Sequence, residues 1–176
     1  MRKVVLTYGI LAGLIVSVLM VVSGSIASGE QGDFSMSLAL GYASMIISLS
    51  MIFFGIRSYR ENYSSGSITF GRAFLVGLYI ALIASVLYVI GWKIYSSIAL
   101  PDFADKYAAR VVDNLKKSGA ADSVVAAKTR EMAEWKETYK NPLVEYGMTF
   151  LEIFPVGVLV SLICAGILKR KPKVGV

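Results

Sequence analysis

The sequence contains no histidine and only one cysteine in 176 residues. Without histidine, the chain cannot build a Ser-His-Asp triad, a Cys-His dyad, a histidine-ligated zinc or haem, or a histidine pH switch. A single cysteine excludes an intrachain disulfide, a Cys-X-X-Cys redox pair and a cysteine-ligated cluster. Cys164 lies in an apolar run, where a small core side chain is expected. We therefore expect no enzyme activity, no cofactor and no metal site.

Charged residues are also scarce, at 17% of the chain against about 25% in soluble domains. Hydrophobic residues make up 56%, and the mean hydropathy is +0.64. These values exclude a disordered chain and argue against a water-soluble globule. The net charge of +6 is compatible with a nucleic-acid partner in principle. However, the basic residues flank the apolar runs, so they indicate membrane topology and no nucleic acid is expected.

Four apolar runs are long enough to cross a bilayer, which takes about 20 residues. A span isolated in lipid must satisfy its own backbone hydrogen bonds, so each run is predicted to be a helix. The length of the first run favours a retained anchor over its alternative, a cleaved signal peptide. The fold predicted is all-α: an integral membrane four-helix bundle in a single domain, residues 1–176. The predicted spans are residues 4–26, 35–56, 73–98 and 143–168.

The basic residues are distributed unequally between the connecting segments. The first connection carries only the acids Glu30 and Asp33. The two termini and the second connection carry nine basic residues and a single acid, Glu61. The positive-inside rule then places both termini and the second connection in the cytoplasm. The nine are Arg2, Lys3, Arg57, Arg60, Arg72, Lys169, Arg170, Lys171 and Lys173.

Residues 99–142, between the third and fourth spans, predict an extracytoplasmic helical hairpin. One apolar stripe recurs every four residues before Ser118-Gly119, where a helix stop is expected, and another follows a predicted cap at Asp122 or Ser123. Asn141-Pro142 marks the break before the fourth span. The stripes either pack on each other and on the membrane rim, or form a docking surface for a partner or lipid. They are Phe103, Tyr107, Val111 and Leu115, then Val125, Met132, Trp135 and Tyr139.

Three spans carry small residues at a spacing of four, a pattern that lets helices approach closely in lipid. The pattern predicts a compact bundle and leaves open whether a stripe serves a dimer instead. Residues 14–19 also align with residues 82–87, which suggests a duplicated parallel hairpin, although apolar sequences match easily by chance. The stripes are Gly9, Gly13 and Ser17; Gly77, Ala81 and Ser85; and Gly157, Ser161 and Ala165.

Two acids lie in the fourth span, and the deeper one is the main candidate for function. Glu152 follows Pro142 by about 15 Å of helix, which places it near mid-membrane. A charge there is costly unless it is paired, protonated or hydrated. Pro155 frees the carbonyl of Leu151. Glu152 is predicted either to fix helix register through a hydrogen bond, for example from Tyr88, or to serve transport, gating or catalysis.

Glu145 lies nearer the outer interface than Glu152 does. Lys93 is expected at the same depth in the third span, so the two form a predicted ion pair.

Several segments resemble an uncharacterised bacterial membrane family, the domain of unknown function numbered 4199. The resemblance implies a bacterial inner-membrane protein, covers nearly the whole chain, and supplies no activity, cofactor or catalytic residue. It draws attention to Gly71-Arg72, Phe150-Leu151-Glu152 and Phe154-Pro155 without giving them a role. The segments that carry it are residues 42–60, 68–74 (ITFGRAF), 101–103 (PDF) and 140–157 (KNPLVEYGMTFLEIFPVG).

The function favoured by these features is that of a non-enzymatic accessory or scaffold protein. The first alternative is a small oligomeric proton- or cation-coupled carrier or channel that uses Glu152. The second is a membrane-embedded lipid-modifying enzyme, which requires Glu145, Glu152 and Lys93 to converge on one cavity. The partners expected are the lipid bilayer and, within it, another membrane protein or further copies of the chain.

Overall fold

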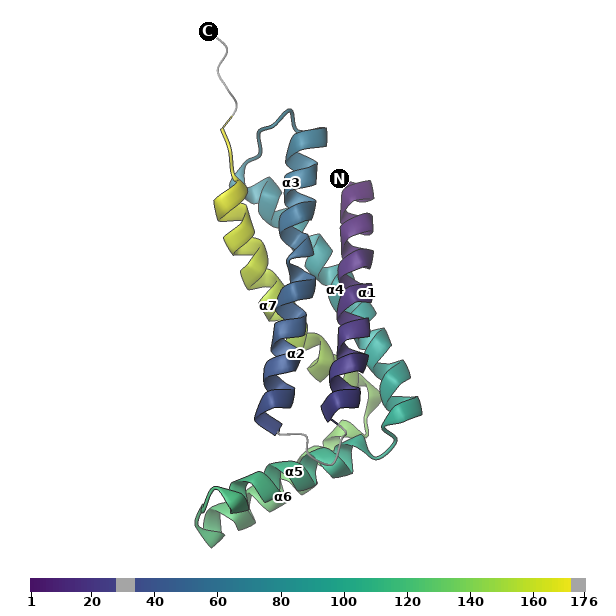
Figure 1. Ribbon diagram of the computed structural model, residues 1–176, viewed down its shortest axis with the longest axis vertical. Coiled ribbons are helices and arrows are strands. Elements are labelled where there is room, and N and C mark those ends of the chain that lie inside the picture. Colours follow the sequence, from purple (N-terminus) through teal and green to yellow (C-terminus); the bar gives the residue numbers. More distant parts are fainter. Residues whose placement is uncertain (28–33, 172–176) are drawn as a thin grey trace. The chain divides into compact units, whose positions relative to one another are not determined.

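Four helices of the chain are long and apolar enough to cross a membrane (Figure 1). The computed structural model describes residues 1–27 and 34–171, which form helices and no named strand. Glu30, Asp33 and Lys173, used above for topology, lie outside the described residues. The predicted all-α fold, with a helical hairpin between the third and fourth membrane helices, is confirmed. The helices are α1 (Arg2–Ala27), α2 (Phe34–Leu49), α3 (Met51–Tyr63), α4 (Phe70–Ala99), α5 (Phe103–Lys117), α6 (Asp122–Tyr139) and α7 (Pro142–Leu168).

The second span differs from the single helix predicted to end at Ile56. It consists of α2 and α3, which meet at Ser50, and it continues to Tyr63. The Ser50 hydroxyl donates to the Ile47 carbonyl at 2.6 Å, and the Ser50 amide is shared between the carbonyls of Ile46 and Ile47. Such hydrogen bonds compete with the regular backbone hydrogen bonds of an α-helix. The prediction stopped too early because hydropathy marks only the apolar part of a helix, not the polar turns that extend it.

The helices form two compact units. The first contains Met1–Trp92 and Thr149–Val176, and the second contains Lys93–Met148, so α4 and α7 contribute to both. The first unit is built around fully buried aliphatic side chains, among them Leu49, Ile80 and Ile153. Its outside is also apolar: Val18 is 61% exposed and Leu159 is 60% exposed. An apolar exterior of this extent is typical of helices surrounded by lipid.

Small residues bring α1 into close contact with α4. A Cβ atom added at Gly9 would lie 2.8 Å from Cβ of Ile83, and one added at Gly13 would lie 2.6 Å from Cβ of Leu87. The hydroxyl of Ser17 is turned back along its own helix and donates to the Gly13 carbonyl at 2.8 Å. The α1 stripe therefore faces large aliphatic side chains of the same chain.

A second close contact joins α4 to α7, and here small residues face small residues. A Cβ atom added at Gly77 would lie 2.9 Å from Cβ of Ser161, and one added at Gly157 would lie 2.7 Å from Cβ of Ala81. The Ser161 hydroxyl donates to the Gly157 carbonyl at 2.7 Å, which leaves its helix face smooth. All three stripes are thus occupied by contacts within one chain. The other members of these two stripes, Ser85 and Ala165, are fully buried.

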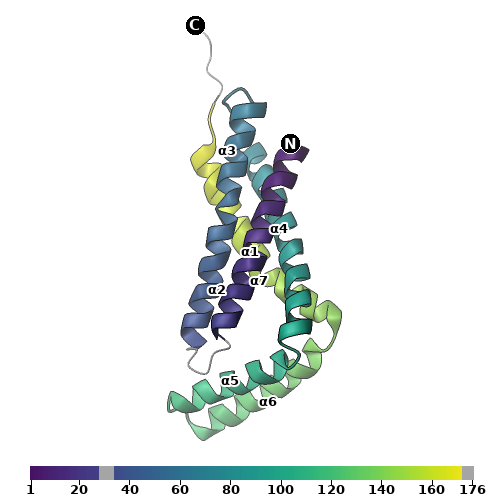
Figure 2. The same ribbon diagram turned by 45° about the vertical axis from the view of Figure 1, so that its right-hand side comes forward.

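The N-terminus, the connection between α3 and α4 and the end of α7 lie at the same end of the first unit (Figures 1 and 2). Ile68 and Arg170 form an isolated antiparallel bridge, with reciprocal N–H···O bonds of 3.0 and 2.9 Å. Gly66, with φ of +77°, turns the connection back so that its amide donates to the Arg60 carbonyl. The residues after α7 are therefore tied to the segment that leads into α4.

In the second unit, α5 and α6 form a hairpin whose apolar stripes pack on each other, as predicted in part, while their packing on the membrane rim stays a prediction. Ring centroids lie 5.2 Å apart for Tyr107 and Trp135 and 6.1 Å apart for Phe103 and Tyr139. Gly119 has φ of +76°, so the predicted helix stop at a left-handed glycine is confirmed. These aromatic contacts stabilise the hairpin, and four ion pairs join charged side chains within it.

The start of α6 corrects the predicted cap. The N-cap residue is Ala121 rather than Asp122 or Ser123, and it makes no side-chain cap bond. Its extended backbone instead presents the Ala121 carbonyl to the amides of Val124 and Val125. Asp122 occupies the first turn, where its negative charge interacts favourably with the helix dipole.

Candidate functional site: polar side chains of α4 and α7

Lys93 of α4 and Glu145 of α7 form the ion pair expected from their depth. The Lys93 ammonium lies 2.7 Å from the Glu145 carboxylate, and the two side chains are 43% and 9% exposed. Lys93 also lies over the ring of Tyr146, with 5.9 Å to its centroid. Glu145 stands in the first turn of α7, where a negative charge is favoured. The carboxylate is thus buried while its lysine stays partly exposed.

Local hydrogen bonds fix this part of both helices. The Asn141 side chain accepts a bond from the Leu143 amide at 3.0 Å and so caps α7 just before Glu145. Ser97 donates its hydroxyl to the Lys93 carbonyl at 2.7 Å. The predicted break at Asn141-Pro142 is therefore a true helix start, since Pro142 is the first residue of α7.

Glu152, the deeper acid, lies on an exposed face of α7. The Tyr88 hydroxyl, from a nearly buried residue of α4, hydrogen-bonds the Glu152 carboxyl. The preceding Leu151 is 67% exposed, so apolar side chains surround the acid on this face. Within the first unit, the arrangement is an interhelical hydrogen bond at the surface of the bundle.

Pro155 lies inside α7, and helix is assigned on both sides of it. Because proline has no amide hydrogen, the carbonyl of Leu151 loses its usual helical partner. Phe150 and Phe154 stack on each other across this turn, with ring centroids 4.8 Å apart. One turn of α7 thus combines a carboxyl group, a freed carbonyl and a stacked aromatic pair.

The described residues contain no group of three or more acidic, histidine or cysteine side chains that could hold a metal ion. Cys164 is buried in the hydrophobic core of the first unit, as its sequence context suggests. The interhelical contacts of ionisable side chains on α4 and α7 thus include the Lys93–Glu145 ion pair and the Tyr88–Glu152 hydrogen bond.

A family model described as "Protein of unknown function (DUF4199)" matches residues 7–170. The chain belongs to the DUF4199 family. The resemblance noted in the sequence is thereby confirmed, and every segment that carries it lies within the match. The family description supplies no activity for a DUF4199 chain. No curated protein and no solved structure shows a significant match.

The segments that first suggested DUF4199 have distinct structural surroundings. The ITFGRAF segment begins with bridged Ile68 and continues into the first turns of α4, where the Thr69 hydroxyl accepts a bond from the Arg72 amide. Residues 140–157 contain the cap of α7, the buried Glu145 and the exposed Glu152. This segment therefore includes the acid of the Lys93 ion pair and the acid of the Tyr88 hydrogen bond.

Two polar contacts in this DUF4199 chain were not predicted from the sequence. Ser48 of α2 is fully buried and donates its hydroxyl to the Ala12 carbonyl of α1 at 2.5 Å. Arg60 donates to the Leu168 carbonyl at the end of α7, at 3.3 Å. A serine inside a hydrophobic run carries no signal of its partner. The arginine was assigned no contact within the fold, although a cation is favoured at a helix C-terminus.

Proposed function

We propose that the protein is a non-enzymatic accessory or scaffold protein of a bacterial inner membrane. In this proposal it binds another membrane protein through the face of α7 that carries Glu152. The observation that supports it most directly is the exposed carboxyl group of Glu152 among exposed apolar side chains of α7. The absence of histidine and the single buried cysteine agree with a non-enzymatic role, since they remove the commonest catalytic pairs.

The α7 face is unfavourable for a carboxyl group in direct contact with lipid. Its neighbours Leu151, Leu159 and Ile163 are 67%, 60% and 61% exposed. An acidic or basic side chain at the centre of a membrane helix costs about 2.5–3.5 kcal/mol. Tyr88 supplies one donor, whereas a carboxylate offers about four acceptor positions. A partner that covers this face and donates a further hydrogen bond removes much of that cost.

The partner we propose is a transmembrane helix that carries a hydrogen-bond donor or a cation at the depth of Glu152. A second copy of the chain is less suitable. A two-fold pairing of identical α7 faces would bring two Glu152 carboxyl groups together. Two such groups cannot both stay ionised at close range. A different chain with a complementary side chain avoids this repulsion and satisfies the acid.

Photo-crosslinking in the native membrane tests the partner. A photoreactive residue at Leu159 is expected to capture one membrane protein, whereas the same residue at Val18, equally exposed on α1, is not. Glu152→Leu should reduce the Leu159 crosslink about tenfold, equivalent to about 1.4 kcal/mol of binding. Glu152→Gln should retain it, because the amide still hydrogen-bonds. Crosslinks from Leu159 to lipid alone, or to a second copy, would overturn this proposal.

The proposed orientation has both termini in the cytoplasm and the α5–α6 hairpin outside, as the basic residues favour. A fluorescent protein fused after the C-terminus should then be bright, and alkaline phosphatase inserted at the exposed Gly119 turn should be active. With the two reporters exchanged, the fluorescent protein should not fluoresce and the phosphatase should be inactive. The reverse pattern would invert the topology, and activity of both reporters at one position would contradict a fixed orientation.

A further inference from the structure

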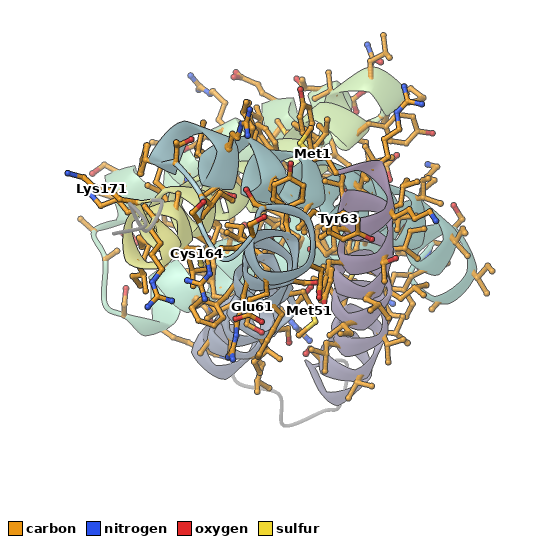
Figure 3. All side chains as sticks on the ribbon, turned by 90° about the horizontal axis from the view of Figure 1, so that it is seen from above. Met1, Met51, Glu61, Tyr63, Cys164 and Lys171 are labelled. Carbon is orange, nitrogen blue, oxygen red and sulfur yellow. The ribbon has the colours of Figure 1, made fainter. Side chains whose placement is uncertain are left out.

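One end of the first unit gathers basic side chains from four separate elements. They come from the first turn of α1, the last turns of α3, the first turn of α4 and the residues that follow α7. Figure 3 looks onto this end, with Met1, Glu61, Tyr63 and Lys171 labelled around it. We call this set the basic end. It consists of Arg2, Lys3, Arg57, Arg60, Arg72, Lys169, Arg170 and Lys171.

Only one acid accompanies these cations in the same sequence segments, and it is already engaged. Glu61 accepts bonds from Arg57 at 3.0 Å and from Arg60 at 3.2 Å. The side chain of Arg60 is only 15% exposed and also bonds the end of α7. Arg60 therefore acts inside the fold. The six cations of the basic end other than Arg57 and Arg60 are exposed, and none of the six has an ion pair among the described residues.

The second unit shows no such imbalance of charge. Residues 93–148 hold nine basic and eight acidic residues. Five ion pairs join them to one another, including Lys93–Glu145 and Lys136–Asp105. The Lys136 ammonium beside Asp105 lowers the pKa of that carboxyl, so the pair stays ionised under mildly acidic conditions. The hairpin neutralises its own charge, whereas the basic end leaves its charge available to an external anion.

The fold also orders the cations. The bridge between Ile68 and Arg170 holds the segment after α7 against the segment before α4. Arg72 follows Ile68 by four residues and lies in the first turn of α4, where the Thr69 hydroxyl accepts a bond from its amide at 3.4 Å. Arg72 and Arg170 are therefore carried on backbone segments bonded to each other. Ordered charges of this kind bind a counter-charge at a smaller entropic cost than a free tail does.

Aromatic side chains at the same end indicate the kind of surface that supplies the counter-charge. Tyr63 is exposed and stacks on Tyr59, with ring centroids 6.0 Å apart. Phe70 is also exposed and stacks on Phe74. The amphipathic ring of tyrosine is typical of the headgroup region of a bilayer. Cations and aromatic rings together match a lipid surface rather than a soluble anion or a nucleic acid.

We infer that the basic end is a recognition surface for anionic phospholipid headgroups, in which Arg72 and Arg170 contact the phosphodiester groups. The flanking Lys169 and Lys171 add charge, and Phe70 and Tyr63 lie among the headgroups. This surface differs from the α7 face of the proposed function, and the inference does not depend on a protein partner. It gives this chain a preference for anionic over zwitterionic lipid at one membrane surface.

Lipid binding by the full-length protein tests the inference. The purified chain is placed in nanodiscs of phosphatidylcholine with increasing phosphatidylglycerol, and bound phosphatidylglycerol is measured by native mass spectrometry. Arg72→Gln/Arg170→Gln should weaken phosphatidylglycerol retention about 30-fold, the product of two surface cations. The control Lys106→Gln/Arg130→Gln removes the same charge from exposed hairpin positions and should leave retention unchanged.

Three further outcomes decide the matter. Lys169→Gln/Lys171→Gln should give a smaller loss, and it keeps the inference testable if the first variant folds poorly in phosphatidylcholine. Equal losses in the basic-end and hairpin variants would overturn the inference, because net charge alone would then explain binding. Displacement of phosphatidylglycerol by inorganic phosphate at constant ionic strength would also overturn it, since the site would then bind a free anion.

Discussion

Lys93→Met is expected to lower the free energy of unfolding by about 3 kcal/mol, because it leaves a buried carboxylate without its cation. Glu145 is 7% exposed, and its ion pair with Lys93 measures 2.7 Å. Glu145→Leu should cost only about 1 kcal/mol, because the partly exposed Lys93 ammonium can extend towards water. The two partners are therefore predicted to contribute unequally. Thermal unfolding in mild detergent measures both variants.

The double variant Lys93→Met/Glu145→Leu is the decisive member of this series. It removes both charges together and should regain most of the stability lost in Lys93→Met. Lys140→Met is the control, because Lys140 and Glu137 are 68% and 72% exposed at the same 2.7 Å separation. A surface pair of this kind contributes about 0–1 kcal/mol. Equal losses from the two single variants would show that the pair does not act as a buried charge.

Gly157→Ala is expected to destabilise the first unit by about 2 kcal/mol, equivalent to about 4–8 °C in Tm. The added Cβ would lie 2.7 Å from Cβ of Ala81, so α4 and α7 must separate. Gly166→Ala is the matched control on the same helix, because a Cβ there meets nothing within 4 Å. Both changes raise helix propensity equally, so the difference between them measures helix packing.

A reciprocal exchange completes this test. Gly157→Ala/Ala81→Gly moves the methyl group from one helix to the other and should restore much of the stability. Scanning calorimetry in detergent, supported by size-exclusion chromatography, separates loss of packing from aggregation. A Gly157→Ala variant as stable as Gly166→Ala would contradict a close α4–α7 contact.

Depth along a membrane helix was predictable from the sequence because each residue adds a fixed rise of about 1.5 Å. Counting from the ends of the spans placed Lys93 and Glu145 at one level, and the structure pairs them. Hairpin features were predictable for a similar reason. Gly119 and Pro142 have backbone requirements that are independent of the rest of the fold.

The side of each membrane helix that faces the bundle interior could not be predicted in the same way. In a soluble helix the apolar stripe identifies the buried face, because the opposite face is polar. In α7 the buried Ile153 and the exposed Leu151 and Leu159 are equally apolar. Neither the outward position of Glu152 nor the partner of each small-residue stripe could be derived from such a pattern. The break at Ser50 was hidden because the hydropathy of Ala39–Tyr63 is that of one continuous span.

The sequence by itself determined that four apolar helices are long enough to cross a membrane, that a helical hairpin separates the last two, and that basic residues gather at the termini and second connection. Composition and segment length are sufficient for these features, because the bilayer imposes one thickness and one hydrophobic requirement. Only the tertiary structure decided that α4 packs against both α1 and α7, that Glu152 lies outward, and that Arg170 is tied to Ile68. These three features depend on which helix faces contact each other, and the apolar faces are chemically alike. The contacts are determined by which backbones can pack closely together.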